Sequence, residues 1–131
     1  MLSRRLLRVK VAKALYAHLK SNSDIRVSEK NLVESIDKAY DLYFQMMSFV
    51  VEVANYAENR IELNKQKKLP TYEDLNPNRR FVDNPVIHLI ANSDSVNDFL
   101  AKRKLSWSQH QDAVKDVYNR LVEAEFYQKY M

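Results

Sequence analysis

Apolar residues recur in the middle of the chain at alternating steps of three and four, the spacing that keeps them on one face of an α-helix. The members of this first series are Val33, Ile36, Tyr40, Tyr43, Met47, Val50, Ala54, Ala57 and Ile61. A second series lies beside it and consists of Leu42, Met46, Phe49, Val53 and Tyr56. Because both series form an arc too wide for a surface helix, we expect one long helix packed centrally between others. The alternative is that the second series docks a partner.

Capping residues divide the rest of the chain into shorter helices. Serine, aspartate and asparagine favour the position before a helix, and proline favours the first position inside it. The expected caps are Ser3, Ser28, Asn84, Ser93 or Ser95, and Ser106 or Ser108. The first helix is expected over about residues 4–20, and the helix after Asn84 is expected to end near Ala91. Residues 70–80 are expected to form a loop, which is basic at both ends through Lys65, Lys67, Lys68, Arg79 and Arg80.

Composition favours an entirely helical fold. The 131 residues include no glycine, although tight β-hairpin turns strongly favour it. Hydrophobic residues make up 46% and charged residues 29%, a composition typical of globular proteins. We therefore expect an all-α fold, a helical bundle of about five helices with one long central helix. Residues 1–131 are expected to form a single helical domain.

The final segment, residues 125–131, continues a partly apolar helical pattern and lacks a capping residue at its end. Two explanations stay open. Either more protein follows this segment, or its aromatic side chains fold back onto the core.

Positive charge is concentrated at the N-terminal end. The net charge is +4, and the first twenty residues contain no acid. Their cations are Arg4, Arg5, Arg8, Lys10, Lys13 and Lys20. This concentration suggests a polyanionic partner, with a solubilising basic helix as the alternative. Because the chain has no cysteine, no signal peptide and no apolar run of about 20 residues, we expect a cytoplasmic protein without a membrane partner.

A projection of the first helix at about 100° per residue separates two faces. The expected core face consists of Leu7, Val11, Ala14, Leu15, His18 and Leu19. The neighbouring face combines cations with an aromatic ring and consists of Arg5, Val9, Lys13, Tyr16 and Lys20. Such a surface suits single-stranded RNA, because cations neutralise phosphates while bases stack on the ring.

Three residues of this helix have competing interpretations. Arg4 and Arg8 project along the core side, where they either reach a ligand beyond the end of the bundle or pair with a glutamate of another helix. Tyr16 is either a stacking platform or a boundary tyrosine with a buried ring and a wet hydroxyl. His18 fits a hydrogen-bonded core histidine better than a metal ligand.

No catalytic or metal-binding pattern is found. His18, His88 and His110 are scattered rather than paired at helical spacing. Adjacent carboxylates such as Glu73 and Asp74 have no apolar surroundings that would tune a general acid. Without glycine, neither a nucleophile elbow nor a phosphate-binding loop can form. We expect no enzyme, no cofactor and no metal.

The sequence of residues 4–16, Arg-Arg-Leu-Leu-Arg-Val-Lys-Val-Ala-Lys-Ala-Leu-Tyr, resembles the opening of NusB, the bacterial transcription antitermination factor. That family begins with clustered arginines, an alanine-rich turn and Ala-Leu-Tyr. The leading Met-Leu-Ser-Arg-Arg and the Asp-Leu-Asn-Pro-Asn of residues 74–78 resemble the longer NusB-type proteins of Bacteroidetes. The Asn-Glu-Ala-rich helix and the Phe-Val-Asn-Gly-Val-Leu segment of the family's second half do not occur here. We therefore expect this chain to be the N-terminal part of a longer protein.

The resemblance implies an all-helical fold that binds boxA-like RNA together with a small-subunit ribosomal protein and the transcription elongation complex. It also implies that the arginine-rich first helix contributes to RNA contact, a role that falls by position to Arg4, Arg5, Arg8 and Tyr16. Lys13 stands where the family often has glutamine. Combined with the projection, the candidate RNA-binding residues are Arg4, Arg5, Arg8, Lys13, Tyr16 and Lys20.

A competing hypothesis is a helical protein–protein interaction or dimerisation module without RNA binding. Its docking surface would be the stripe of Met46, Phe49, Val53 and Tyr56, and its partner another protein or a second copy in a homodimer. A salt-resistant dimer without RNA affinity would favour this hypothesis.

Overall fold

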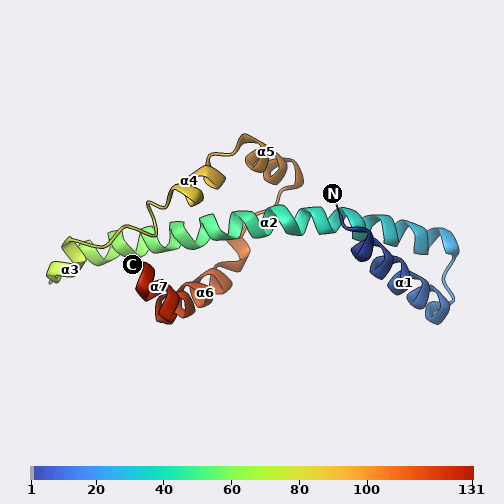
Figure 1. The fold of residues 1–131 in the computed structure, drawn as a ribbon, viewed down its shortest axis with the longest axis horizontal. Coiled ribbons are helices and arrows are strands. Elements are labelled where there is room, and N and C mark those ends of the chain that lie inside the picture. Colours follow the sequence, from blue (N-terminus) through green and yellow to red (C-terminus); the bar gives the residue numbers. More distant parts are fainter. Residues whose placement is uncertain (1) are drawn as a thin grey trace. The chain divides into compact units, whose positions relative to one another are not determined.

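The computed structural model describes residues 2–131, and the Met1 of the N-terminal resemblance lies outside this range. The fold is all-α, with 78% of the residues helical and no strand in the described part of the chain. Seven α-helices and one 3-10 helix are found over residues 2–131, and α2 (Ile25–Lys65) is the expected long helix (Figure 1). The count exceeds the expected five because the loop contains the short α3 (Tyr72–Leu75) and the last helix is interrupted.

The chain forms two compact units. The first ends at Tyr43, and the second runs from Phe44 to Met131. Since the boundary falls inside α2, one continuous helix contributes residues to both units. A single domain over residues 1–131 stays a prediction.

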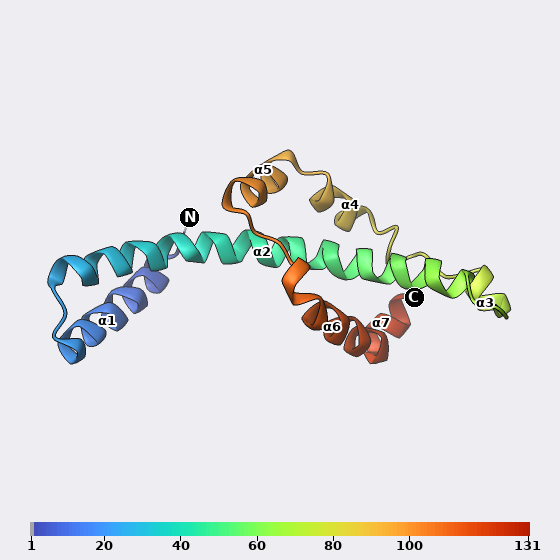
Figure 2. The same cartoon turned by 180° about the vertical axis from the view of Figure 1, so that it is seen from behind.

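The first unit is a helical hairpin of α1 (Arg4–Ser21) and the first part of α2, which run side by side in both views (Figures 1 and 2). Ser3 caps α1 as expected, because its Oγ accepts a hydrogen bond from the Leu6 amide at 3.2 Å. The helix ends at Asn22, whose left-handed backbone (φ 49°) is a conformation that asparagine tolerates well.

The expected cap at Ser28 is wrong. The backbone carbonyl of Asp24 already accepts hydrogen bonds from the amides of Val27 and Ser28. The Asp24 carboxylate accepts a hydrogen bond of 3.2 Å from the backbone amide of Arg26. Aspartate therefore satisfies the first amides of α2 one turn earlier, by the same chemistry that a serine would use. Ser28 lies inside the helix, and its hydroxyl is available for other contacts.

The second unit holds the buried core. In both views, the second half of α2 runs between α4 (Pro85–Ala91) with α5 (Asp94–Arg103) and α6 (Gln111–Glu123) with α7 (Glu125–Tyr130). The buried side chains are Val53, Ala54, Ala57, Val82, Ile87, Val96, Val114 and Tyr127. All of them belong to this unit. Central packing, the favoured interpretation of the apolar pattern, is confirmed for the second half of α2.

Aromatic contacts cover the stripe that was the alternative docking surface. The rings of Phe49 and Trp107 lie 4.5 Å apart between centroids, and those of Tyr56 and Tyr118 lie 5.2 Å apart. The Trp107 indole also donates a hydrogen bond of 3.0 Å to the carbonyl of Gln45. These contacts come from the same chain. The prediction of a free stripe from Met46 to Tyr56 is therefore wrong, although Met46 itself is exposed.

The remaining caps follow the sequence more closely. The side chain of Asn84 accepts a hydrogen bond of 2.9 Å from the Val86 amide, with Pro85 at the first helical position, as expected. Ser93 stands before α5 without a side-chain capping bond. Ser108 opens the 3-10 helix η1 (Ser108–His110), which leads directly into α6.

The C-terminal aromatic residues fold back onto their own unit. The extended backbone of Ala124 (ψ 132°) separates α7 from α6. Tyr127 is buried against Phe81, with ring centroids 5.4 Å apart, and burial raises the pKa of Tyr127 to about 12. The hydroxyl of Tyr130 donates to the carbonyl of Arg80 at 3.1 Å. The structure shows the fold-back of this segment, and the continuation of the protein beyond it stays a prediction.

Within residues 2–131, none of the helices combines the length and the apolar character that a membrane crossing requires.

Candidate functional site

All six candidate RNA-binding residues lie on α1, and all six side chains are exposed. Tyr16 is 66% exposed, so the boundary interpretation with a buried ring is wrong. The ammonium group of Lys20 lies 5.9 Å from the centroid of the Tyr16 ring, which brings a cation and an aromatic face together. Among the described residues, none of the five cations of this set forms an ion pair. The ion-paired alternative for Arg8 is therefore not observed.

The six residues occupy two sides of α1. At about 100° per residue, Arg5, Lys13, Tyr16 and Lys20 fall within an arc of roughly 80°, which we call the cationic strip. Arg4 and Arg8 are displaced from this strip, on the side of Val11 and Leu15. The structure thus exposes all six side chains but assembles four of them on one surface.

A polar groove that was not predicted from the sequence lies between α1 and the first part of α2. This polar groove has a volume of about 300 Å³. Its polar lining consists of Lys10, Lys13, His18, Ser21, Ser23, Ser28, Asn31 and Ser35, with Ala14, Ala17 and Leu32 between them. No carboxylate is among these lining residues, all of which lie in the described part of the chain. Lys13 belongs to both the polar groove and the cationic strip.

Hydrogen bonds order the polar groove. Lys10 donates to the carbonyl of Ser35 at 2.7 Å, which ties the two helices together. At the other end, the Nδ1 of His18 lies 2.9 Å from the hydroxyl of Ser28, which lies 3.1 Å from that of Ser23. His18 is half-buried and hydrogen-bonded, as expected for a structural histidine.

A sequence feature that could have revealed this groove is the spacing of polar residues on α2. Ser28, Asn31 and Ser35 stand at steps of three and four, which places them on one helical face. The expected cap at Ser28 concealed the pattern, since it placed this residue before the helix.

No residue of the expected core face of α1 is buried, and three of its six residues are exposed. Val11, Leu15 and Leu19 are 40%, 54% and 77% exposed, and α1 contains no buried residue. The reason is that α1 packs within its unit against a single helix, which covers only a narrow band of its surface. Val11 and Leu15 instead line, with Ile25, an apolar groove of about 230 Å³.

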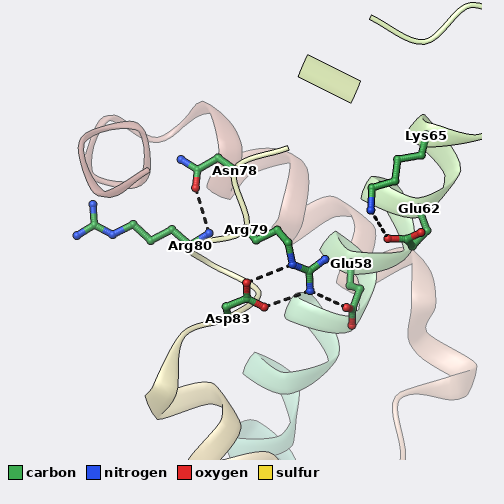
Figure 3. Close-up of polar contacts among 7 residues, drawn as sticks. All are labelled: Glu58, Glu62, Lys65, Asn78, Arg79, Arg80 and Asp83. Carbon is green, nitrogen blue, oxygen red and sulfur yellow. Dashed lines mark hydrogen bonds and ion pairs between the residues drawn. The ribbon is translucent and has the colours of Figure 1, made fainter. Parts of the chain in front are cut away.

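The basic ends of the 70–80 loop differ from α1, because acids pair with three of their five cations, Lys65, Lys67 and Arg79. Arg79 donates to both carboxylate oxygens of Asp83 at 3.1 Å and to Glu58 of α2 at 3.0 Å (Figure 3). These bonds, with Asp83 contributing most, hold the pKa of Arg79 above its ordinary value. Lys65 is paired with Glu62 at 2.8 Å in the same view. This cluster anchors the loop to α2 and leaves little net charge for a ligand.

Two further cations of this region also have local partners. Lys67 lies 3.1 Å from Asp74, whose carboxylate also accepts a hydrogen bond from the Thr71 amide in a capping box. The Thr71 amide and Lys67 together lower the pKa of Asp74. The guanidinium of Arg80 lies 4.6 Å from the ring centroid of Tyr130. These residues stabilise the loop, whereas the cations of the strip face solvent.

Over residues 2–131, no group of three or more histidines and carboxylates is placed to hold a metal ion. Comparison of the chain with models of known protein families, with curated proteins and with solved structures gives no match. The fold and the surface of α1 are therefore the structural basis for a functional proposal.

Proposed function

We propose that the chain is an RNA-binding transcription antitermination factor of NusB type, which binds boxA-like RNA through α1. The observation that carries the proposal is the cationic strip, whose exposed cations have no acidic partner among residues 2–131. The resemblance of residues 4–16 to the opening of the NusB family supports the same function.

The proposed mechanism is binding without chemistry. Arg5, Lys13 and Lys20 neutralise successive phosphates and release counterions from the RNA. The exposed ring of Tyr16 offers a platform for one unstacked base, an interaction worth about 1–3 kcal/mol. Arg4 and Arg8 extend the positive potential around the first turns of the helix and strengthen the attraction at longer range.

The partners proposed with this function are a small-subunit ribosomal protein and the transcription elongation complex. They derive from the NusB resemblance. In this assignment, α1 supplies the RNA contact while the partners bind elsewhere on the protein.

Fluorescence anisotropy across a salt series tests the proposal, with a boxA-like RNA and a scrambled RNA of equal length. We expect the boxA-like RNA to bind more tightly, and the logarithm of the binding constant to fall linearly with the logarithm of the salt concentration. Equal affinity for both RNAs would refute the boxA-type specificity. Absence of binding to either RNA at low salt would refute the function itself.

A second candidate function, a helical module that dimerises without binding RNA, is favoured by one observation. Leu15, Leu19 and Ile25 of the first unit are each more than half exposed. A second copy of the chain would remove this apolar surface from water. Sedimentation velocity at low and high salt distinguishes the candidates, because a dimer built on apolar contacts persists at high salt and an RNA complex does not.

A further inference from the structure

The polar groove of the first unit carries an inference about how RNA is held. We propose that this groove binds one phosphate group of the RNA backbone. The inference rests on the proposed function only for the source of the phosphate, since the groove itself is formed by α1 and α2 in the structure.

Both lysines that line the groove favour an anion. Lys10 and Lys13 line it, and no carboxylate does. Lys10 donates to a neutral carbonyl oxygen, that of Ser35, at 2.7 Å. This bond fixes the ammonium group in place without cancelling its charge, so the cation is positioned before a ligand arrives.

The serine hydroxyl groups in the groove can supply a hydrogen-bond donor to the ligand. Ser21 donates to Ser23 at 2.8 Å, and the chain continues through Ser28 to the Nδ1 of His18. The last two contacts can run in either direction, because a hydroxyl both donates and accepts and the histidine tautomer is adjustable. When His18 donates to Ser28, and Ser28 donates to Ser23, the Ser23 hydroxyl is free to donate a hydrogen bond to the ligand. An anion in the groove selects this direction.

Size and position fit a backbone phosphate. The volume of about 300 Å³ is ample for a phosphate group with bound water, since one water occupies roughly 30 Å³ in the liquid. Lys13 lines the groove and also belongs to the cationic strip. An RNA strand that crosses the strip at Lys13 therefore brings a phosphate to the mouth of the groove.

The test places a charge in the groove and an identical charge elsewhere on the same helix. Asn31 is exposed on α2 and lines the groove, whereas Asn55 is exposed on α2 in the second unit. Asn31→Glu adds a carboxylate to the groove, and Asn55→Glu is the matched control with the same net charge. Asn31→Lys and Asn55→Lys form a second pair of opposite sign. Circular dichroism confirms that all four variants keep their helix content.

Two titrations are made with the full chain and each variant. In the first, amide chemical shifts are followed by NMR as inorganic phosphate is added, against sodium chloride of equal ionic strength. In the second, RNA binding is followed by anisotropy. We expect phosphate to shift the amides of His18, Ser23 and Asn31. We also expect Asn31→Glu to weaken both phosphate and RNA binding roughly tenfold relative to Asn55→Glu, and Asn31→Lys to strengthen both relative to Asn55→Lys.

The outcomes separate this inference from the proposed function. RNA binding that responds equally to the substitutions at Asn31 and Asn55 would overturn the groove and leave the function standing. Phosphate shifts in the groove without RNA binding would support the groove as an anion site and refute the function. Phosphate shifts spread evenly over exposed lysines would show non-specific charge screening and overturn the groove.

Discussion

Arg79 and Arg5 have contrasting surroundings, and the difference decides what each can bind. Arg79 is held by Asp83 and Glu58, so its charge is used within the molecule. Arg5 is exposed on α1 and forms no ion pair among the described residues. A phosphate can therefore approach Arg5 without displacing a carboxylate, which is the condition for tight, salt-dependent binding.

Arg5→Gln and Lys13→Gln should each remove one phosphate contact. For single-stranded RNA, each substitution should lower the slope of log binding constant against log salt by about 0.7. Lys30→Gln is the control, since Lys30 lies on the same hairpin but is paired with Glu34 at 3.8 Å. Anisotropy across a salt series provides the measurement. A slope equal to that of the control for both variants would remove the cationic strip as the binding surface.

Tyr16→Ala should weaken RNA binding through loss of stacking, by about 1–3 kcal/mol. Tyr16→Phe should bind nearly as tightly as the wild type, because the stacking face is kept. Since Tyr16 is 66% exposed, neither substitution should change the melting temperature by much. If both variants lose the same affinity, the hydroxyl rather than the ring makes the contact.

The candidate site could be predicted from the sequence only in part. The exposure of Arg5, Lys13 and Lys20 followed from helical spacing, because charged side chains on one face rarely bury. The polar groove did not follow, because it depends on which face of α1 meets which face of α2. That pairing is a tertiary contact, and the pattern of either helix alone does not contain it.

Helix α2 shows what periodicity can and cannot establish at the scale of an element. Its apolar series continues unbroken from Val33 to Ile61, and the structure confirms one continuous helix. Val53, Ala54 and Ala57 are buried, yet Val33 is 53% exposed. Periodicity identifies the face that is apolar, but burial also requires a neighbouring element along the same stretch. Tertiary contacts also explain the break at Ala124. The contacts of Tyr127 with Phe81 and of Tyr130 with Arg80 favour this break over a continuing helix.

Matched substitutions on α2 should reveal this difference in stability. Val53→Ala should lower the free energy of unfolding by about 2 kcal/mol, because it removes buried methyl groups from the second unit. Val33→Ala should be neutral or slightly stabilising, because alanine has the higher helix propensity and the site is exposed. Urea denaturation followed by circular dichroism gives both values. Equal losses would show that Val33 is covered in solution.

The fold class of the whole molecule was predictable, because it follows from summed properties. Absence of glycine, regular helical spacing and well-placed caps all favoured an all-α fold. The meeting of distant segments was not predictable. Tyr130 donates to the carbonyl of Arg80, a residue fifty positions earlier in the chain, and no local pattern announces such a contact.

The buried phenol of Tyr127 should make stability depend on pH in the alkaline range. Burial raises its pKa in the folded chain to about 12, from the ordinary phenol value of 10.0. The folded state therefore favours the neutral phenol, and this contribution is complete below pH 10.0 and is lost as the pH rises towards 12. Tyr127→Phe should lose less stability than the wild type over this range. The measurement is urea denaturation at several pH values, and identical slopes for both proteins would contradict the assignment.

The continuity of α2 has a consequence for the hairpin that precedes the core. No side chain of α1 is buried, so burial of apolar side chains stabilises the hairpin much less than it stabilises the second unit. An isolated pair of helices of this kind would be marginal in water. The buried second half of α2 therefore stabilises the helical conformation of its first half, towards Ile25. Hydrogen exchange should be graded along this one helix, slowest around Ala57 and fastest near Ile25, and a captured RNA strand should flatten the gradient.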